Sequence, residues 1–98
     1  MTKKRDRLQI IQRILKVIER KNGAIKPTHI LYKANLSHQM LDDYLAELIT
    51  KGFVEQHNTK TGKTYSLTQK GFDYLNKYKM IVEFVDSFGL SESEDRKI

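Results

Sequence analysis

The hydrophobic period of the sequence changes at Gly52 from that of a helix to that of a strand, and this change limits the chain to a mixed architecture of helices and a small sheet. Before Gly52, apolar residues recur at the three- and four-residue steps of an α-helix. After it, residues 53–57 and 64–67 are short β-prone runs on either side of the polar segment 58–63. We therefore expect a β-hairpin whose basic turn covers residues 58–63, with helices before and after it.

Three helices are predicted before the hairpin, and each has recognisable end signals. Asn22 and Gly23 tolerate the left-handed backbone conformation that ends helices, and Gly52 does the same later. Pro27 is tolerated in a first turn, and Ser37 is a typical N-cap. The predicted helices cover residues 6–21, 27–34 and 38–51.

Each long helix carries an apolar stripe that is expected to be buried. In the first helix the stripe consists of Leu8, Ile10, Ile11, Ile14, Leu15, Val17 and Ile18. In the third it consists of Met40, Leu41, Tyr44, Leu45, Leu48 and Ile49. Thr68 is predicted to cap a fourth helix of about twenty residues, which Gly89 ends.

Length and composition indicate one small folded domain. The chain has 98 residues, of which 39% are hydrophobic and 31% charged, and it contains no cysteine. This excludes a disulfide framework, a thiolate zinc site and a cysteine nucleophile. We expect no signal peptide, because Gln and Arg interrupt the apolar positions near the N-terminus. We expect no membrane span, because no apolar stretch approaches the length of about 18 residues that a span requires. A cytoplasmic, nucleoid-associated location is expected.

The net charge of +6 is unevenly distributed along the chain. Residues 1–33 carry +8, residues 34–56 carry −3, residues 57–79 carry +4 and residues 80–98 carry −3. Two basic segments separated by an acidic one can meet on one face after folding, as they do in proteins that follow a phosphate backbone. A solvated surface with no such role is the simpler alternative.

The order of elements is that of a helix-turn-helix followed by a β-wing. The string Leu45-x-x-Leu48-x-x-x-Gly52-Phe53-Val54, followed by Tyr65-x-Leu67-Thr68-x-Lys70-Gly71, closely resembles the winged-helix regulators of archaea and bacteria. Ala34-Asn35-Leu36-Ser37 and Tyr44-Leu45 extend the match. Over residues 8–88 the chain is similar to the archaeal 10a-type chromosomal proteins and their predicted transcription-regulator relatives.

This resemblance implies a mainly α (α+β) winged helix-turn-helix fold, double-stranded DNA as the partner, and a homodimer formed through the last helix. The sequence then divides into a basic arm at residues 1–7, the winged domain at 8–71, a dimerisation helix at 72–89 and a charged tail at 90–98. The fourth helix ends near Phe88, where a long coiled-coil arm would continue. The chain therefore looks like a short version of the family.

The residues expected to contact DNA lie in the third helix, the hairpin tip and the basic segments. The start of the third helix would enter the major groove, where Gln contacts adenine and Ser reaches several base edges. The alternative is that Ser37 is only an N-cap and His38 only a surface residue. Lysines at the hairpin tip would reach phosphates or the minor groove. The full predicted set is Arg5, Lys33, Ser37, His38, Gln39, Asp42, Asp43, Lys60, Thr61 and Lys63.

The outward face of the predicted recognition helix is acidic, with Asp42, Asp43 and Glu47 and no basic residue before Lys51. Carboxylates repel phosphates and lower non-specific affinity, although an Asp can accept a hydrogen bond from cytosine. We therefore favour a sequence-selective transcription regulator. A DNA-packaging protein and a winged helix that binds another protein remain the two alternatives.

The sequence favours no enzymatic chemistry. His29, His38 and His57 lie in three different elements, without a pair at metal-ligand spacing. No phosphate-binding glycine loop or nucleophile elbow is present. We expect no cofactor, no metal and no small-molecule ligand, although an effector site within a dimer stays open.

The fourth helix is expected to be the dimer interface, because its apolar residues cover half of the helical wheel and continue beyond the small domain. Four of them step by three and four residues, as in a two-helix seam. The predicted interface consists of Tyr74, Leu75, Tyr78, Ile81, Val82, Val85 and Phe88. The alternative is a helix that folds back over its own domain.

Overall fold

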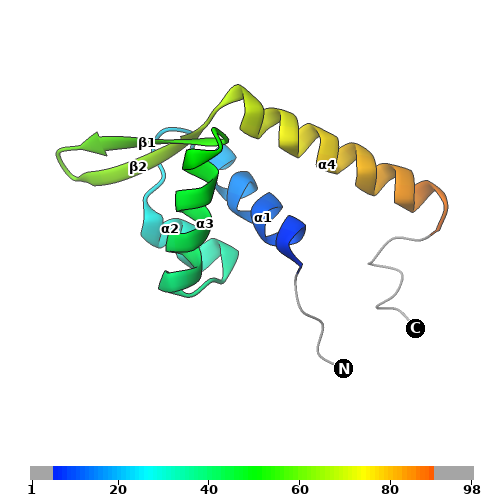
Figure 1. Ribbon diagram of the computed structural model, residues 1–98, viewed down its shortest axis with the longest axis horizontal. Coiled ribbons are helices and arrows are strands. Elements are labelled where there is room, and N and C mark those ends of the chain that lie inside the picture. The colour runs from blue at the N-terminus through cyan, green and yellow to red at the C-terminus, as the bar shows by residue number, and fades with distance from the viewer. Residues whose placement is uncertain (1–5, 90–98) are drawn as a thin grey trace.

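A computed structural model describes residues 6–89 and confirms the predicted order of three helices, a hairpin and a fourth helix. The elements are α1 (Arg7–Arg20), α2 (Pro27–Ala34), α3 (His38–Thr50), β1 (Val54–Thr59), β2 (Gly62–Leu67) and α4 (Gln69–Ser87). In Figure 1 the first three helices gather below the hairpin. The hairpin projects to the left and α4 to the right, so the two extensions point away from each other.

Side-chain caps fix the starts of three helices. The Asp6 side chain accepts a hydrogen bond from the backbone N–H of Gln9 at 2.8 Å, and the Gln9 side chain accepts one from the backbone N–H of Asp6 at 3.2 Å. Ser37 caps α3 and Thr68 caps α4, each by accepting an N–H three residues ahead at 3.2 Å. These contacts satisfy N–H groups that have no partner inside the helix, which is why the starts follow the sequence signals.

The core lies where α1, α2 and α3 meet the hairpin. Its fully buried members include Ile14, Leu15 and Ile18 of α1 together with Ile30 of α2. The complete set of core residues is Ile10, Ile11, Ile14, Leu15, Ile18, Ile25, Ile30, Ala34, Leu36, Leu41, Leu45, Leu48, Val54, Tyr65 and Leu67. Helices α1 and α3 contribute the faces that their periodicity predicted, and α2 adds Ile30 and Ala34.

Two residues of the predicted stripes are exposed instead of buried. Leu8 stands in the first turn of α1 with 57% of its surface exposed, and Met40 stands in the first turn of α3 with 38% exposed. Both lie at the margin of an apolar stripe, in a turn whose backbone is held by a polar cap rather than by packing. Helical periodicity identifies the stripe but does not show where its ends leave the core.

The hairpin is longer, and its turn shorter, than the sequence indicated. Strands β1 and β2 pair antiparallel from Val54 opposite Leu67 to Thr59 opposite Gly62. The predicted six-residue turn at 58–63 is therefore wrong in extent, and only Lys60 and Thr61 lie outside the ladder. The Thr59 hydroxyl donates to the Gly62 carbonyl at 2.7 Å, and Gly62 has a φ of 128°, which suits the tight closure.

The loop between α1 and α2 pairs with the outer side of β2, a contact that no local sequence pattern indicated. Tyr65 donates its backbone N–H to the Ile25 carbonyl at 3.1 Å, and Gly23 donates to the Tyr65 carbonyl at 2.9 Å. The Asn22 side chain accepts the backbone N–H of Leu67 at 2.6 Å. The hairpin is thus bonded to the loop that precedes α2 and cannot move independently of it.

Helix α4 begins in close contact with the segment that follows α3. Thr68 donates its backbone N–H to the Phe53 carbonyl at 3.1 Å and its hydroxyl to the Gly52 carbonyl at 2.5 Å. Gly71 is buried there, and a Cβ at this position would lie 2.5 Å from the Phe53 oxygen. Phe72 and Leu75 pack against the core. The first turns of α4 therefore belong physically to the domain, and the rest of the helix leaves it.

None of the helices within residues 6–89 combines the length and apolarity needed to cross a membrane.

Gly71→Ala should destabilise the protein, although Ala is the better helix former by about 1 kcal/mol. The added methyl would lie 2.5 Å from the Phe53 oxygen, so α4 has to shift. We expect a loss of about 1–3 kcal/mol in the free energy of unfolding, typical of overpacking, measured by urea denaturation. Asn76→Ala, at an exposed position of α4, is the control and should be neutral or slightly stabilising. A Gly71→Ala protein as stable as the unaltered one would contradict the close-contact argument.

Candidate DNA-binding surface

The first turn of α3 presents three polar side chains to solvent. Ser37, His38 and Gln39 are all exposed, while the opposite face of the helix buries Leu41, Leu45 and Leu48. The Ser37 hydroxyl oxygen accepts the backbone N–H of Met40 at 3.2 Å, so the N-cap interpretation of this residue is correct. The cap fixes the helix start and leaves His38 and Gln39 as its outward side chains.

Gln39 is held along the helix by an acidic neighbour one turn later. Its side-chain amide donates to the Asp43 carboxylate at 3.0 Å. Asp42 and Asp43 are both exposed, as the sequence predicted for this face. The contact restricts the Gln39 rotamer and uses part of the Asp43 charge, and it engages the amide nitrogen of Gln39 but not its carbonyl oxygen.

Glu47, the third carboxylate of this face, is neutralised by two basic side chains. It pairs with Arg7 at the start of α1 and, at 2.8 Å, with the Lys51 ammonium. These hydrogen bonds, first that of Arg7 and then that of Lys51, lower the pKa of Glu47 to about 2. The Glu47 side chain is 28% exposed. The outward face of α3 is therefore less acidic than the count of carboxylates indicated.

The hairpin tip carries exposed cations and is tied to the start of α2. Lys60, Thr61 and Lys63 are exposed. The Lys26 ammonium donates to the Thr61 carbonyl at 2.9 Å, across 35 residues of sequence. Lys26, which was not in the predicted DNA-binding set, thus joins the basic hairpin. The sequence shows a basic residue before Pro27. The local sequence does not show that the hairpin tip lies close enough to bind this side chain.

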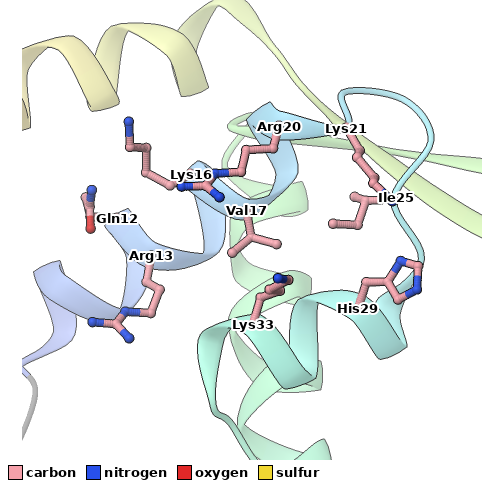
Figure 2. A pocket seen from close by; sticks show the side chains of 9 residues that line it. All are labelled: Gln12, Arg13, Lys16, Val17, Arg20, Lys21, Ile25, His29 and Lys33. Atoms are coloured by element: carbon pink, nitrogen blue, oxygen red, sulfur yellow. The ribbon is translucent and has the colours of Figure 1, made fainter.

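One member of the predicted DNA-binding set lies on α2 instead of α3 or the hairpin tip, and another is not among the described residues. Lys33 lines a groove between α1 and α2 (Figure 2). Arg5 lies outside the described residues. The members that the structure brings to exposed positions on α3 and the hairpin tip are Ser37, His38, Gln39, Asp42, Asp43, Lys60, Thr61 and Lys63.

Comparison with known sequences identifies the family. The sequence profile described as winged helix-turn-helix matches residues 4–85. The chain belongs to the winged helix-turn-helix family. The hairpin formed by β1 and β2 is the wing, and α3 occupies the place of the recognition helix in this fold.

One sequence relative and two solved structures are similar to this chain. An uncharacterized protein of Methanocaldococcus jannaschii is 35% identical over 82 residues, which are 84% of this chain and 36% of that protein. The chain thus spans about a third of that relative. The structure of Sso10a-2, a DNA-binding protein from Sulfolobus solfataricus, superimposes with a TM-score of 0.71 at 18% identity, covering 95% of each chain. That of MepR of S. aureus in complex with DNA gives 0.65 at 17% identity, covering 89% of this chain and 67% of MepR.

No group of three or more histidine or carboxylate side chains in residues 6–89 of this winged helix is arranged to hold a metal ion. The three histidines are separated: His29 lies on α2 and His38 on α3, and the His57 ring nitrogen is 2.7 Å from the Ser66 hydroxyl across the wing. The His57 contact therefore joins the two wing strands.

The far half of α4 leaves the winged domain with its apolar side chains exposed. We call this surface the α4 apolar face, and it consists of the exposed residues Met80, Ile81, Val82, Phe84 and Phe88 together with the half-buried Val85. Ile81, Phe84 and Phe88 are 61–65% exposed, and the rings of Phe84 and Phe88 lie 5.1 Å apart. Met80 and Phe84 were not in the predicted dimer set.

The near half of α4 packs on its own domain. The Tyr74 hydroxyl donates to the Leu8 carbonyl at 3.2 Å, and its ring meets Phe53 edge-on at 5.8 Å. Tyr74 also stacks on Tyr78, with ring centres 6.2 Å apart. Tyr74 and Leu75, both in the predicted dimer set, are half-buried against the core of the same chain. The near half of α4 therefore follows the interpretation in which the helix covers its own domain, and the dimer interface on the far half stays a prediction.

Glu47→Gln should flatten the acid branch of the stability profile. The folded-state pKa of Glu47 lies below its ordinary value of 4.5, so its contribution is fully present above pH 4.5 and is lost as the pH falls towards about 2. We expect the unfolding free energy of the variant to fall less steeply between these values, measured by urea denaturation at a series of pH values. Glu55→Gln removes an exposed carboxylate from β1 and should change the slope less. Equal slopes for both variants would contradict the role of the Arg7 and Lys51 contacts.

Proposed function

We propose that this protein is a DNA-binding transcription regulator that binds duplex DNA as a homodimer. The observation that carries the proposal is the placement of α3 in a winged helix-turn-helix domain, with polar side chains exposed on its first turn and a basic wing beside it. In this fold the recognition helix enters the major groove and the flanking elements contact the backbone. The similar MepR structure is a complex with DNA, which supports this use of the surface.

The proposed division of work follows the chemistry of the side chains. His38 and Gln39 would reach base edges, since an amide can pair with adenine, and Ser37 would hold the helix start. Lys60 and Lys63 would contact phosphates, with the Lys26 ammonium fixing the wing tip by its bond to the Thr61 carbonyl. Asp42 and Asp43 would disfavour sequences that give no compensating base contact, because they repel the backbone. This distribution favours selective over general binding.

A titration of random duplex DNA at two salt concentrations, followed by selection from a random-sequence pool, tests the proposal. Salt-sensitive binding together with an enriched motif supports the regulator. Binding without a motif would indicate the DNA-packaging alternative. Absence of binding at low salt would indicate a winged helix that binds another protein.

Replacing both Lys60 and Lys63 with Ala should weaken binding to all sequences alike, because phosphate contacts carry no sequence information. The slope of log K against log salt should fall by up to about 2 in magnitude. Fold stability should change little, since both side chains are exposed. Lys77→Ala with Lys79→Ala removes the same charge from exposed positions on α4 and should leave the slope unchanged. An unchanged slope for the wing variant would remove the wing from the interface.

The proposed dimer would form through the α4 apolar face. Five of its six members are large exposed hydrophobic residues, namely Met80, Ile81, Val82, Phe84 and Phe88. They lie on one side of the last helical turns, while Lys79, Glu83 and Asp86 lie on the other. A continuous exposed apolar face with charged residues around it is typical of an association surface. A second copy of the chain is the occupant, because two such faces are self-complementary under twofold symmetry.

Ile81→Asp with Phe84→Asp should convert the dimer to a folded monomer, measured by analytical ultracentrifugation. Each carboxylate would be costly to bury in a helix–helix contact, whereas both positions are exposed in the single chain. Circular dichroism should show that the fold is kept. Asn76→Asp with Ser87→Asp adds the same charge on exposed polar positions of α4 and should remain dimeric. An unaltered protein that sediments as a monomer at micromolar concentration would contradict the dimer.

A further inference from the structure

The strongest unassigned feature of the molecule is a groove between α1 and α2. Its volume is about 540 Å³, within the range of about 300–1,000 Å³ that is typical of small-molecule sites. Five basic residues line it, and we call it the basic groove: Arg13, Lys16, Arg20, Lys21 and Lys33. In Figure 2 they stand around an apolar floor made by Val17 and Ile25.

The cations of the basic groove face no carboxylate within its lining. In residues 6–89, the ion pair found for this set is that of Lys16 with Glu19, and it is long at 3.9 Å. Elsewhere on the domain, Arg7 and Lys51 are paired with Glu47. Five like charges around one concave surface repel each other, and a bound anion would relieve this repulsion.

The floor of the groove adds a second requirement. Ile25 is buried and Val17 half-buried, and the aliphatic stems of the lysines and arginines extend the apolar surface around them. An inorganic anion would leave this surface in water. A ligand that pairs with the cations and also covers the apolar floor carries several negative charges and a ring or other apolar group.

The basic groove is separate from the proposed DNA surface. Figure 2 looks into it from the side of α1 and α2, with α3 passing behind these helices. A duplex on the first turn of α3 and the wing tip would therefore leave the groove open. The lining also includes neither His38 nor Gln39, nor any residue of the wing.

We propose that the basic groove binds an organic polyphosphate of nucleotide size, with its phosphates on the arginines and lysines and its ring against Val17 and Ile25. Arginine suits this role because its guanidinium matches phosphate oxygens in a fork-like pair of hydrogen bonds. The charge of +5 on the lining favours several phosphates over a single carboxylate. This binding does not depend on the proposed function, since Lys33 is the one groove residue in the predicted DNA-binding set and the proposed DNA contacts do not use it.

Isothermal titration calorimetry with ATP, tripolyphosphate and adenosine tests both requirements on the full chain. We expect ATP to bind at least about tenfold more tightly than tripolyphosphate, because only ATP also covers the apolar floor. Adenosine, which lacks the phosphates, should be weaker still. Equal affinity for ATP and tripolyphosphate would overturn the organic part of the proposal. Absence of ATP binding would overturn all of it.

A pair of variants with the same loss of charge separates the basic groove from the DNA surface. Arg13→Ala with Arg20→Ala should weaken ATP binding about tenfold or more, while the anisotropy of a labelled duplex shows unchanged DNA binding. Lys60→Ala with Lys63→Ala should weaken duplex binding and leave ATP binding as in the unaltered protein. Equal losses of ATP affinity in both variants would overturn the groove, because they would show an effect of net charge alone. Failure of duplex binding in the unaltered protein would count against the DNA proposal and not against this one.

Discussion

The contact of Gly71 with the Phe53 carbonyl is the constraint on which the arrangement of the two extensions depends. At this point the segment after α3 and the start of α4 lie too close for any side chain larger than hydrogen. Thr68 closes the same junction from the other side, through its backbone and its hydroxyl. The Lys70 ammonium adds a bond to the Lys51 carbonyl at 2.8 Å, at the end of α3. Because the recognition helix, the wing and α4 all leave from this junction, their relative directions are set together.

The motif that indicated the fold can now be explained residue by residue. Gly52 supplies the left-handed conformation after α3, with a φ of 84°, and Gly71 supplies the close approach. Thr68 serves as helix cap and as the bond to Gly52, and Lys70 closes the end of α3. All of these residues belong to the sequence motif by which the chain resembles winged-helix proteins. The motif therefore corresponds to the contact between the end of α3 and the start of α4 as well as to the order of the elements.

The features that could be predicted from the sequence are those that depend on residues close together in the chain. Helix starts followed from side-chain caps at Ser37 and Thr68, and buried faces followed from the spacing of apolar residues. The hairpin was placed correctly but given too long a turn, because Asn58 and Lys63 have weak strand propensity and are paired only through the ladder.

The parts of the site that escaped prediction all depend on contacts between distant residues. Lys26 reaches the wing tip across 35 positions, and Arg7 reaches Glu47 across 40. The basic groove likewise gathers cations from α1, α2 and the loop between them, and their convergence has no signature in the local pattern. The charge count along the sequence gave the sign of the charge in each segment but could not show which charged side chains pair with each other. The count therefore overstated the acidity of α3, where Glu47 is paired with Arg7 and Lys51.

Because the start of α4 is fixed at the junction, a small rotation there moves the far end of the helix by a large distance, as with a lever. Its 19 residues extend for about 28 Å, so a rotation of about 10° at the junction displaces its far end by about 5 Å. If two such levers meet at the α4 apolar face, the same rotation changes the separation of the two recognition helices by a comparable amount. The glycine at position 71, which allows α4 to approach the Phe53 carbonyl, would thus help to set the spacing of the two recognition helices along a DNA duplex.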